Sequence, residues 1–229
     1  DLTFDKGDAG LNRIIWDLRY NGPTPLSGAP TTGWGSFTSG PRVPPGMYTA
    51  KLTANGQSQA VKIEVKGDPR INLQPNYYAQ KDQTLKEFMI LLGSANEMIN
   101  ATTAINEQLG ELNKGLEAGS IENRSNVLSD VKSALQKVLD LDEELRRPPN
   151  SMTYRTKPRL REEIMAIMNA IDGATARPTD QQVGRIVELQ EDTKMVTRML
   201  QDFIETELAQ INAKLAGPDA IKIDLEKRE

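Results

Sequence analysis

Hydrophobic and polar positions follow two different periods along this chain of 229 residues. Over 46–54 and 57–66 apolar and polar residues alternate, which is the pattern of strands that bury one face. Asn55-Gly56 separates the two runs and predicts a two-residue hairpin turn, because both central positions of a type I′ turn need a positive φ. From residue 77 onward the apolar positions recur every three or four residues, as in amphipathic helices.

A third apolar run, over 11–20, predicts another strand, and the Gly-, Pro- and Thr-rich stretch 21–45 predicts a long loop. Alternation in this strand would place one apolar set on the core face, with Trp16 as its anchor: Ile14, Trp16, Leu18 and Tyr20. Asp17 and Arg19 would then lie on the opposite face. We expect them to pair with each other or with Asp68 and Arg70, where the chain leaves the strands.

Residues 1–70 are therefore expected to form a small antiparallel β-sandwich of the immunoglobulin-like type. The three strands are short of the roughly seven that a complete domain of this type uses, so the sandwich is expected to be incomplete at its N-terminus. A linker over 71–76 would connect it to the helical part.

The helical period predicts four helices within 77–216, at about 77–117, 120–147, 158–173 and 179–215, followed by a tail over 217–229. Thr179 and Gln182 match a capping box at the start of the last helix. Short breaks between the helices favour an antiparallel four-helix bundle with up-down-up-down order. The predicted fold class is α+β and multidomain, an immunoglobulin-like sandwich followed by this bundle.

The composition excludes several common kinds of catalytic and metal-binding site. The chain has no histidine and no cysteine, which excludes the commonest general base, thiolate catalysis, disulfides and the usual zinc ligands. We therefore expect no catalytic residue, no cofactor and no bound metal. The net charge is −4 with both signs interspersed, so nothing points to a nucleic-acid partner. No segment has the roughly 18 to 20 apolar residues that a membrane span needs.

Two further features suit binding more than catalysis. The loop 28–40 carries Trp34 and Phe37 among glycines, and its rings could contact a glycan or a protein, or fold back over an open face of the sandwich. The acidic run 140–144 has no calcium-loop spacing, and its consecutive residues point to different sides of a helix. A solvated helix surface explains that run better than a metal site.

Three motifs, GLNRIIWDLRYNGP, PPGMYTAKL and GDPR, resemble the region after the β-propeller in large bacterial BNR-repeat, sortilin-like proteins that are labelled glycosyl hydrolases. They also resemble, more loosely, the immunoglobulin-like domain of flagellar hook-capping proteins. The resemblance implies that the matching positions are framework of an accessory domain: Asn12, Trp16, Asp17, Arg19, Gly46, Tyr48, Asp68, Pro69 and Arg70. It also implies a C-terminal piece of a larger exported protein, periplasmic or extracellular.

The function expected from the sequence is therefore structural. The chain would be a non-catalytic accessory region that packs on a β-propeller domain or subunit, or mediates assembly. An alternative is a glycan- or protein-binding module that uses the loop 28–40 or a groove of the bundle. A third reading is a glycosidase built on carboxylates such as Asp17 beside an acid of the bundle, but it lacks a recognisable pair.

Overall fold

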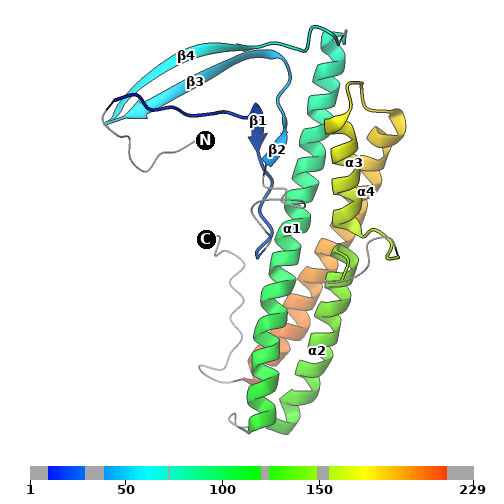
Figure 1. The fold of residues 1–229 in the computed structure, drawn as a ribbon. Helices are drawn as coiled ribbons and strands as arrows, with labels where there is room; N and C mark the ends of the chain where they lie inside the picture. Colours follow the sequence, from blue (N-terminus) through cyan, green and yellow to red (C-terminus); the bar gives the residue numbers. More distant parts are fainter. Residues whose placement is uncertain (1–9, 29–38, 72, 120–123, 149–154, 216–229) are drawn as a thin grey trace.

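The computed structural model describes residues 10–28, 39–71, 73–119, 124–148 and 155–215. Most of these residues are helical. The helices are α1 (Pro75–Ala118), α2 (Arg124–Leu145), α3 (Leu160–Gly173) and α4 (Asp180–Phe203), which continues through the π-turn η1 (Ile204–Leu208) into α5 (Ala209–Lys214). At 1.5 Å per residue, the 44 residues of α1 span about 66 Å. This one helix is therefore the spine along which the other helices lie (Figure 1).

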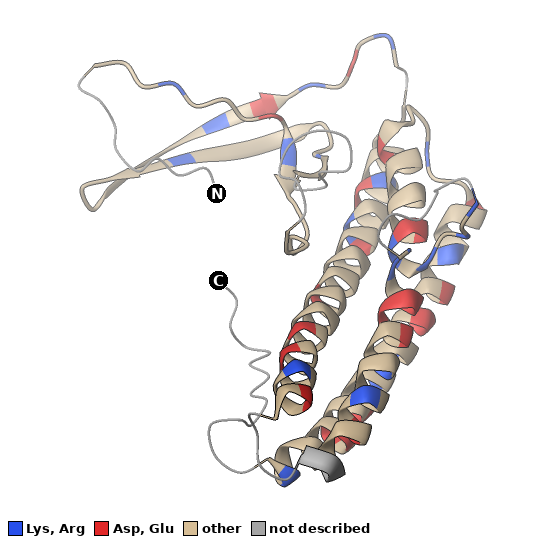
Figure 2. Ribbon diagram, turned by 60° about the horizontal axis from the view of Figure 1, so that its bottom comes forward, with Lys and Arg blue, Asp and Glu red and all other residues tan. Residues whose placement is uncertain are grey.

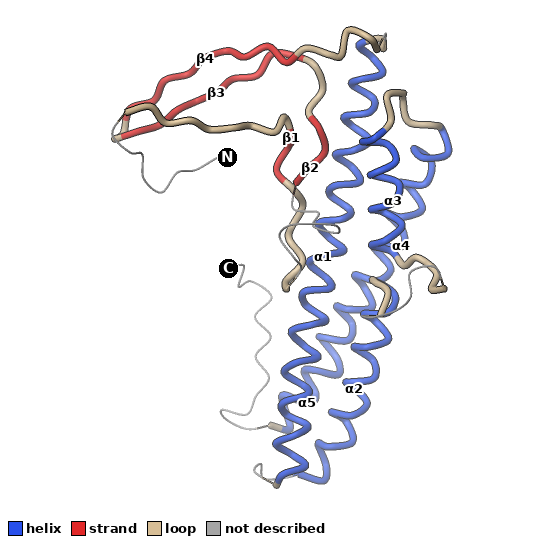
Figure 3. Tube along the Cα trace, viewed as in Figure 1, coloured by secondary structure: helices blue, strands red, loops and turns tan. Residues whose placement is uncertain are grey.

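The helices form three antiparallel rods, which corrects the expected up-down-up-down order of four. α2 and α3 run one after the other in the same direction along α1, and α4 with α5 returns beside them (Figure 3). Polar contacts record this order from one end of α1 to the other: Glu117 with Lys132, Thr102 with Asp142, Asn96 with Arg161, and Lys81 with the carbonyl of Asp172. α2 ends at Leu145, and α3, which begins at Leu160, continues in the same direction, so α2 and α3 together make a single rod.

One hydrophobic core runs between the rods. Its largest fully buried side chains come from all three rods: Phe88, Leu92, Ile99, Ile105, Leu109, Leu145, Ile164, Leu189 and Leu208. Thr193, a polar residue at a core position of α4, is 7% exposed, and its hydroxyl donates to the carbonyl of Leu189 at 2.6 Å. The core therefore accepts this hydroxyl because the helix backbone satisfies it.

The strands form two separate two-stranded antiparallel sheets, so the expected β-sandwich is wrong. β1 (Arg19–Asn21) pairs with β2 (Ser39–Arg42), and β3 (Gly46–Ala54) pairs with β4 (Gln57–Val65). Neither sheet has a second layer of strands among the described residues. The fold is therefore a helical body that carries two β-ribbons, and the immunoglobulin-like assignment does not hold.

The expected strand over 11–20 shrinks to its last residues. Leu18 has a φ of 60°, which interrupts the extended chain just before β1 begins. Ile14, Ile15 and Leu18 are 45%, 72% and 43% exposed, so the alternation in this segment does not mark a buried face. Without an opposing sheet, these side chains have no core to enter.

The hairpin predicted from Asn55-Gly56 is confirmed. β3 and β4 pair without a register shift from Gly46 opposite Val65 to Ala54 opposite Gln57. Asn55 and Gly56 have φ values of 50° and 75°, as a type I′ turn requires. The capping box at the start of α4 is also confirmed, with the Thr179 hydroxyl accepting from the Gln182 amide at 3.2 Å.

Candidate functional site

The β3–β4 hairpin has one apolar face and one polar face. Residues that oppose each other in an antiparallel pair share a face, so the register gathers the apolar set on one side, with Gln57 and Gln59 beside it near the turn: Tyr48, Ala50, Leu52, Val61, Ile63 and Val65. Leu52, Val61 and Ile63 are 60%, 62% and 40% exposed. We call this set the apolar hairpin face. It is an amphipathic surface whose hydrophobic side lacks a covering layer among the described residues.

The opposite face is mostly polar. It carries Lys51, Lys62 and Glu64, with Thr49, Thr53 and Ser58 between them, together with Ala60 and the exposed Met47. Figure 2 shows lysines on both strands, and Glu64 forms an exposed ion pair with Lys66 at 3.7 Å. This side is suited to water, which leaves the apolar hairpin face as the side suited to contact.

The hairpin projects from the helical body, and only its base is held by aromatic contacts. The Trp16 and Tyr48 rings meet edge to face with centroids 5.4 Å apart. The Trp16 indole donates to the carbonyl of Arg19 at 3.0 Å, and the Tyr48 hydroxyl donates to the carbonyl of Pro44 at 2.6 Å. Trp16 is half-buried in this contact and is not the core anchor that the sequence predicts.

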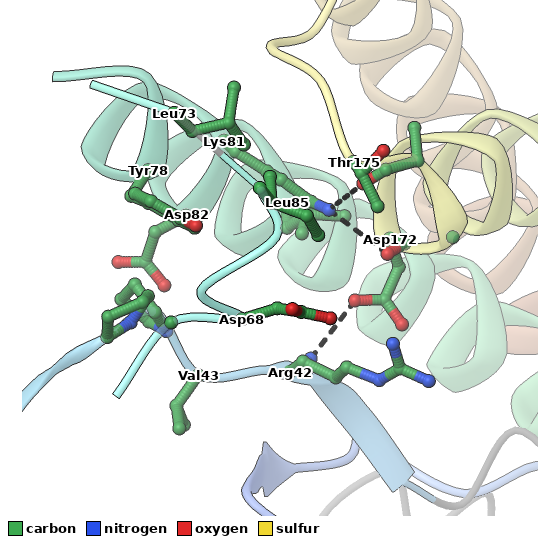
Figure 4. A pocket seen from close by; sticks show the side chains of 16 residues that line it. Arg42, Val43, Asp68, Leu73, Tyr78, Lys81, Asp82, Leu85, Asp172 and Thr175 are labelled. Carbon is green, nitrogen blue, oxygen red and sulfur yellow. Dashed lines mark hydrogen bonds between the residues drawn. The ribbon is translucent and has the colours of Figure 1, made fainter. Parts of the chain in front are cut away.

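Asp172, at the end of α3, ties both strands of the small β1–β2 sheet to the helices. Its carboxylate accepts from the Arg42 backbone amide (Figure 4) and from the Arg19 guanidinium, each at 3.1 Å. The Arg19 side chain also donates to the carbonyl of Gly40 at 2.9 Å. The carboxylate is 16% exposed and Arg19 is 28% exposed, so this ion pair is partly shielded from water. We call this arrangement the Asp172 joint.

Lys81 of α1 closes the same joint from the other side. Its ammonium donates to the carbonyls of Asp172 and Ala174, at 3.1 and 2.6 Å, at the C-terminal end of α3 (Figure 4). A cation at this end of a helix is favoured by the helix dipole. Burial lowers the pKa of the Lys81 ammonium below its ordinary value, and the nearby charge of Asp172 opposes that change.

A cavity of about 220 Å³ lies at this joint, between the strands and the start of α1. Three carboxylates line it, and each is bound to a cation: Asp172 to Arg19, Asp82 to Lys86 at 2.7 Å, and Asp68 to Arg70 at 2.6 Å. Hydrogen bonds from Arg70 lower the pKa of Asp68. The described residues contain no group of three acids placed to hold a metal ion. The chemistry of this cavity is that of a charged joint between elements.

Tyr20 of β1 extends the joint onto α1. The Lys86 ammonium lies 4.7 Å from the centre of the Tyr20 ring, in a cation–π contact, while it also binds Asp82. Burial raises the pKa of the Tyr20 phenol above its ordinary value, and hydrogen bonding with Lys86 opposes this change. The hydrogen bond with Asp82 raises the pKa of Lys86.

The loop before residue 29 is fastened along α1 by three polar side chains. The Asn96 amide donates to the carbonyl of Thr24 at 2.7 Å, and the Asn100 amide donates to that of Pro25 at 3.0 Å. Glu97 accepts from the Thr24 hydroxyl at 2.9 Å. Asn96 and Asn100 lie one turn apart on α1, beside the buried Ala95 and Ile99. Amides at this spacing beside core positions were an available sequence signal for this contact.

The structure separates most of the residues that the sequence singled out. Asp17 accepts from the backbone amide of Arg19 at 3.1 Å, and the side chain of Arg19 goes to Asp172 instead. Asp68 and Arg70 pair with each other, so the predicted charged lattice between the two segments is wrong. The Arg19 side chain is bound instead by Asp172 at the end of α3, 102 residues beyond Arg70.

The remaining predicted residues have local roles or lie outside the described residues. The Asn12 amide donates to the carbonyl of Gly10 at 3.3 Å, in an exposed segment. Gly46 starts β3 and Pro69 is exposed in the turn that leads to α1. Trp34 and Phe37, together with most of the loop 28–40, lie outside the described residues. Sequence analysis missed Asp172, since an acid in the last turn of a helix gives no sign of its distant partner.

No protein-family model, curated protein or solved structure matches this chain. The resemblance of the segments in 11–70 to propeller-associated regions therefore stays a prediction. In the part of the chain that the structure describes, none of the helices has the length and apolarity to cross a bilayer.

Proposed function

We propose that this chain is a non-catalytic assembly region whose apolar hairpin face docks on a β-sheet domain of the protein to which it belongs. The resemblance noted above makes a β-propeller the expected domain and an exported protein the expected parent. The observation that carries the proposal is the exposure of Leu52, Val61 and Ile63 together on one side of a regular hairpin. A contiguous apolar surface of this kind, bordered by polar residues, is characteristic of an interaction site.

The mounting of the hairpin supports the same function. The Asp172 joint and the contacts of Asn96 and Asn100 fasten the chain that leads into the hairpin to the helical body. The three rods would then act as a rigid support that holds the hairpin clear of the helices. A rigid support that presents one small binding surface fits the non-catalytic role proposed for this chain.

Photochemical cross-linking in the native host tests this proposal. A benzoylphenylalanine placed at Leu52 lies on the apolar hairpin face, and the same group at the adjacent Lys51 lies on the polar face and serves as the control. We expect irradiation to join position 52, and not position 51, to a β-sheet domain, which peptide mass spectrometry identifies. Equal yields from the two positions, or no product from position 52, would contradict the proposal.

A further inference from the structure

The hairpin is a two-stranded ribbon whose outer edges lack a pairing strand among the described residues. Isolated two-stranded hairpins are at best marginally stable in water, and a third strand or a covering layer normally completes them. Natural edge strands are usually short, bulged, interrupted by proline or charged, because a long regular edge pairs with other chains. β4 has nine residues, no proline and no bulge against β3, and it carries Lys62 and Glu64. It therefore has charge but lacks the other three protections.

The register fixes which backbone groups point outward. A two-residue turn is closed by a hydrogen-bonded pair, here Ala54 with Gln57, and such pairs alternate with non-hydrogen-bonded ones along the ladder. Thr49 and Lys62 therefore form a non-hydrogen-bonded pair. The peptide groups of Lys62 point away from β3, as do those of Ser58, Ala60 and Glu64, and together they make a continuous edge for pairing.

The two edges differ in their surroundings. Tyr48 of β3 packs on Trp16 and donates a hydrogen bond to Pro44, so β3 has local contacts at its base. β4 carries the β-branched Val61, Ile63 and Val65 on the apolar hairpin face, and such residues pack well against a neighbouring strand. Lys62 of β4, like Lys51 of β3, has no ion pair within the described residues, whereas Glu64 is bound to Lys66.

We infer that the partner adds a β-strand to the outer edge of β4. This strand would place apolar side chains beside Val61 and Ile63, continuing the apolar hairpin face, and an acidic side chain beside Lys62. Its main-chain hydrogen bonds supply affinity and its alternating side chains supply specificity, as in other cases of strand addition. This inference rests on the proposed function and names the form of its partner.

Proline substitutions at directly opposed positions test the inference. Lys62→Pro removes an outward N–H from the edge of β4, and Thr49→Pro does the same to the edge of β3, while both leave the hydrogen bonds of the hairpin itself intact. Each is combined with the photoreactive group at Leu52 in the native host. Loss of interstrand hydrogen bonds at the β4 edge should lower the cross-linking yield about tenfold for Lys62→Pro and leave it unchanged for Thr49→Pro.

The outcomes separate this inference from the proposed function. A selective loss with Lys62→Pro, with the cross-linked peptide coming from a strand of alternating apolar residues, supports strand addition. Unchanged yields in both variants overturn strand addition and leave face-to-face docking in place. A loss confined to Thr49→Pro, or an equal loss in both, also overturns pairing at β4. Absence of any product from position 52 in the unsubstituted chain overturns both proposals.

Discussion

At the scale of single residues, Asp172 has the most consequential contacts. It bonds to β1 through Arg19 and to β2 through the Arg42 amide, so one carboxylate holds both strands. Asp172→Asn keeps the shape and removes the charge. We expect the local free energy of opening to fall by about 1.5 kcal/mol, which corresponds to about tenfold faster hydrogen exchange at the Arg42 amide.

The control for this change is Asp202→Asn, at an exposed position of α4 away from the joint. It should leave exchange at Arg42 unaltered. If the two variants give the same exchange rate, Asp172 does not hold the joint. Thermal unfolding of the helices should respond little to either change, because neither residue belongs to the hydrophobic core.

Tyr20 provides a pH-dependent test of the same contact region. Because burial raises its pKa above the ordinary value of 10.0, its stabilising contribution is complete below pH 10 and is lost as the pH rises through the folded-state pKa. We expect the difference in unfolding free energy between the natural chain and Tyr20→Phe to be constant up to about pH 10 and to change above it.

The difference absorbance of these two proteins at alkaline pH gives the titration of Tyr20 directly. Its midpoint should exceed 10, and a midpoint at or below 10 would show that the phenol is solvated. Comparing against Tyr20→Phe matters because Lys81, whose pKa is lowered, contributes with the opposite sign in this range.

At the scale of elements, Gly40 shows why β1 and β2 can pair so closely. A Cβ atom at this position would lie 2.4 Å from the carbonyl oxygen of Asn21 and 2.6 Å from that of Tyr20. Both obstacles are backbone atoms, so Gly40→Ala must displace a strand. We expect it to destabilise the β1–β2 pair by about 2 kcal/mol and to speed exchange at the Val43 amide, which donates to Leu18.

Gly46→Ala is the matched substitution, because its Cβ would meet nothing nearer than a Tyr48 ring carbon at 3.8 Å. Its exchange rates should stay close to those of the natural chain. This contrast also bears on the framework role that the resemblance implies for Gly46, since the space around it would accept a methyl group. Equal effects of the two alanines would contradict the close approach at Gly40.

Local patterns predicted elements well where neighbouring residues determine the structure. Asn55-Gly56 specifies its turn through backbone conformation alone, and the Thr179 cap depends on a residue three positions away. The strand predicted over 11–20 was wrong because alternation indicates a strand only if another sheet covers its apolar side. The predicted reversal of the chain between α2 and α3 was wrong for a related reason. Helical periodicity indicates where the helices lie in the sequence but not whether one helix reverses direction after the previous one.

At the scale of the whole molecule, distant pairs decide the arrangement. Arg19 and Asp172 are 153 positions apart, and neither residue's neighbours indicate the other. The candidate surface combines both kinds of information. Its hairpin and its amphipathic pattern are readable in the sequence, but its exposure follows from the absence of a second sheet over it in the described structure.

This division between a packed helical body and an uncovered hairpin predicts unequal effects of the same substitution. Leu109 is fully buried between the rods, and Leu52 is 60% exposed on the hairpin. Leu109→Ala should lower the free energy of unfolding by about 2 to 5 kcal/mol, since it leaves a cavity, whereas Leu52→Ala should change it by less than about 0.5 kcal/mol. Denaturant unfolding of the purified chain at two protein concentrations measures both changes.

A large loss of unfolding free energy for Leu52→Ala at both concentrations would mean that the chain covers its own hairpin face. A loss that grows with protein concentration would mean that a second copy of the chain covers it. Either result would remove the surface on which docking to a β-sheet domain depends.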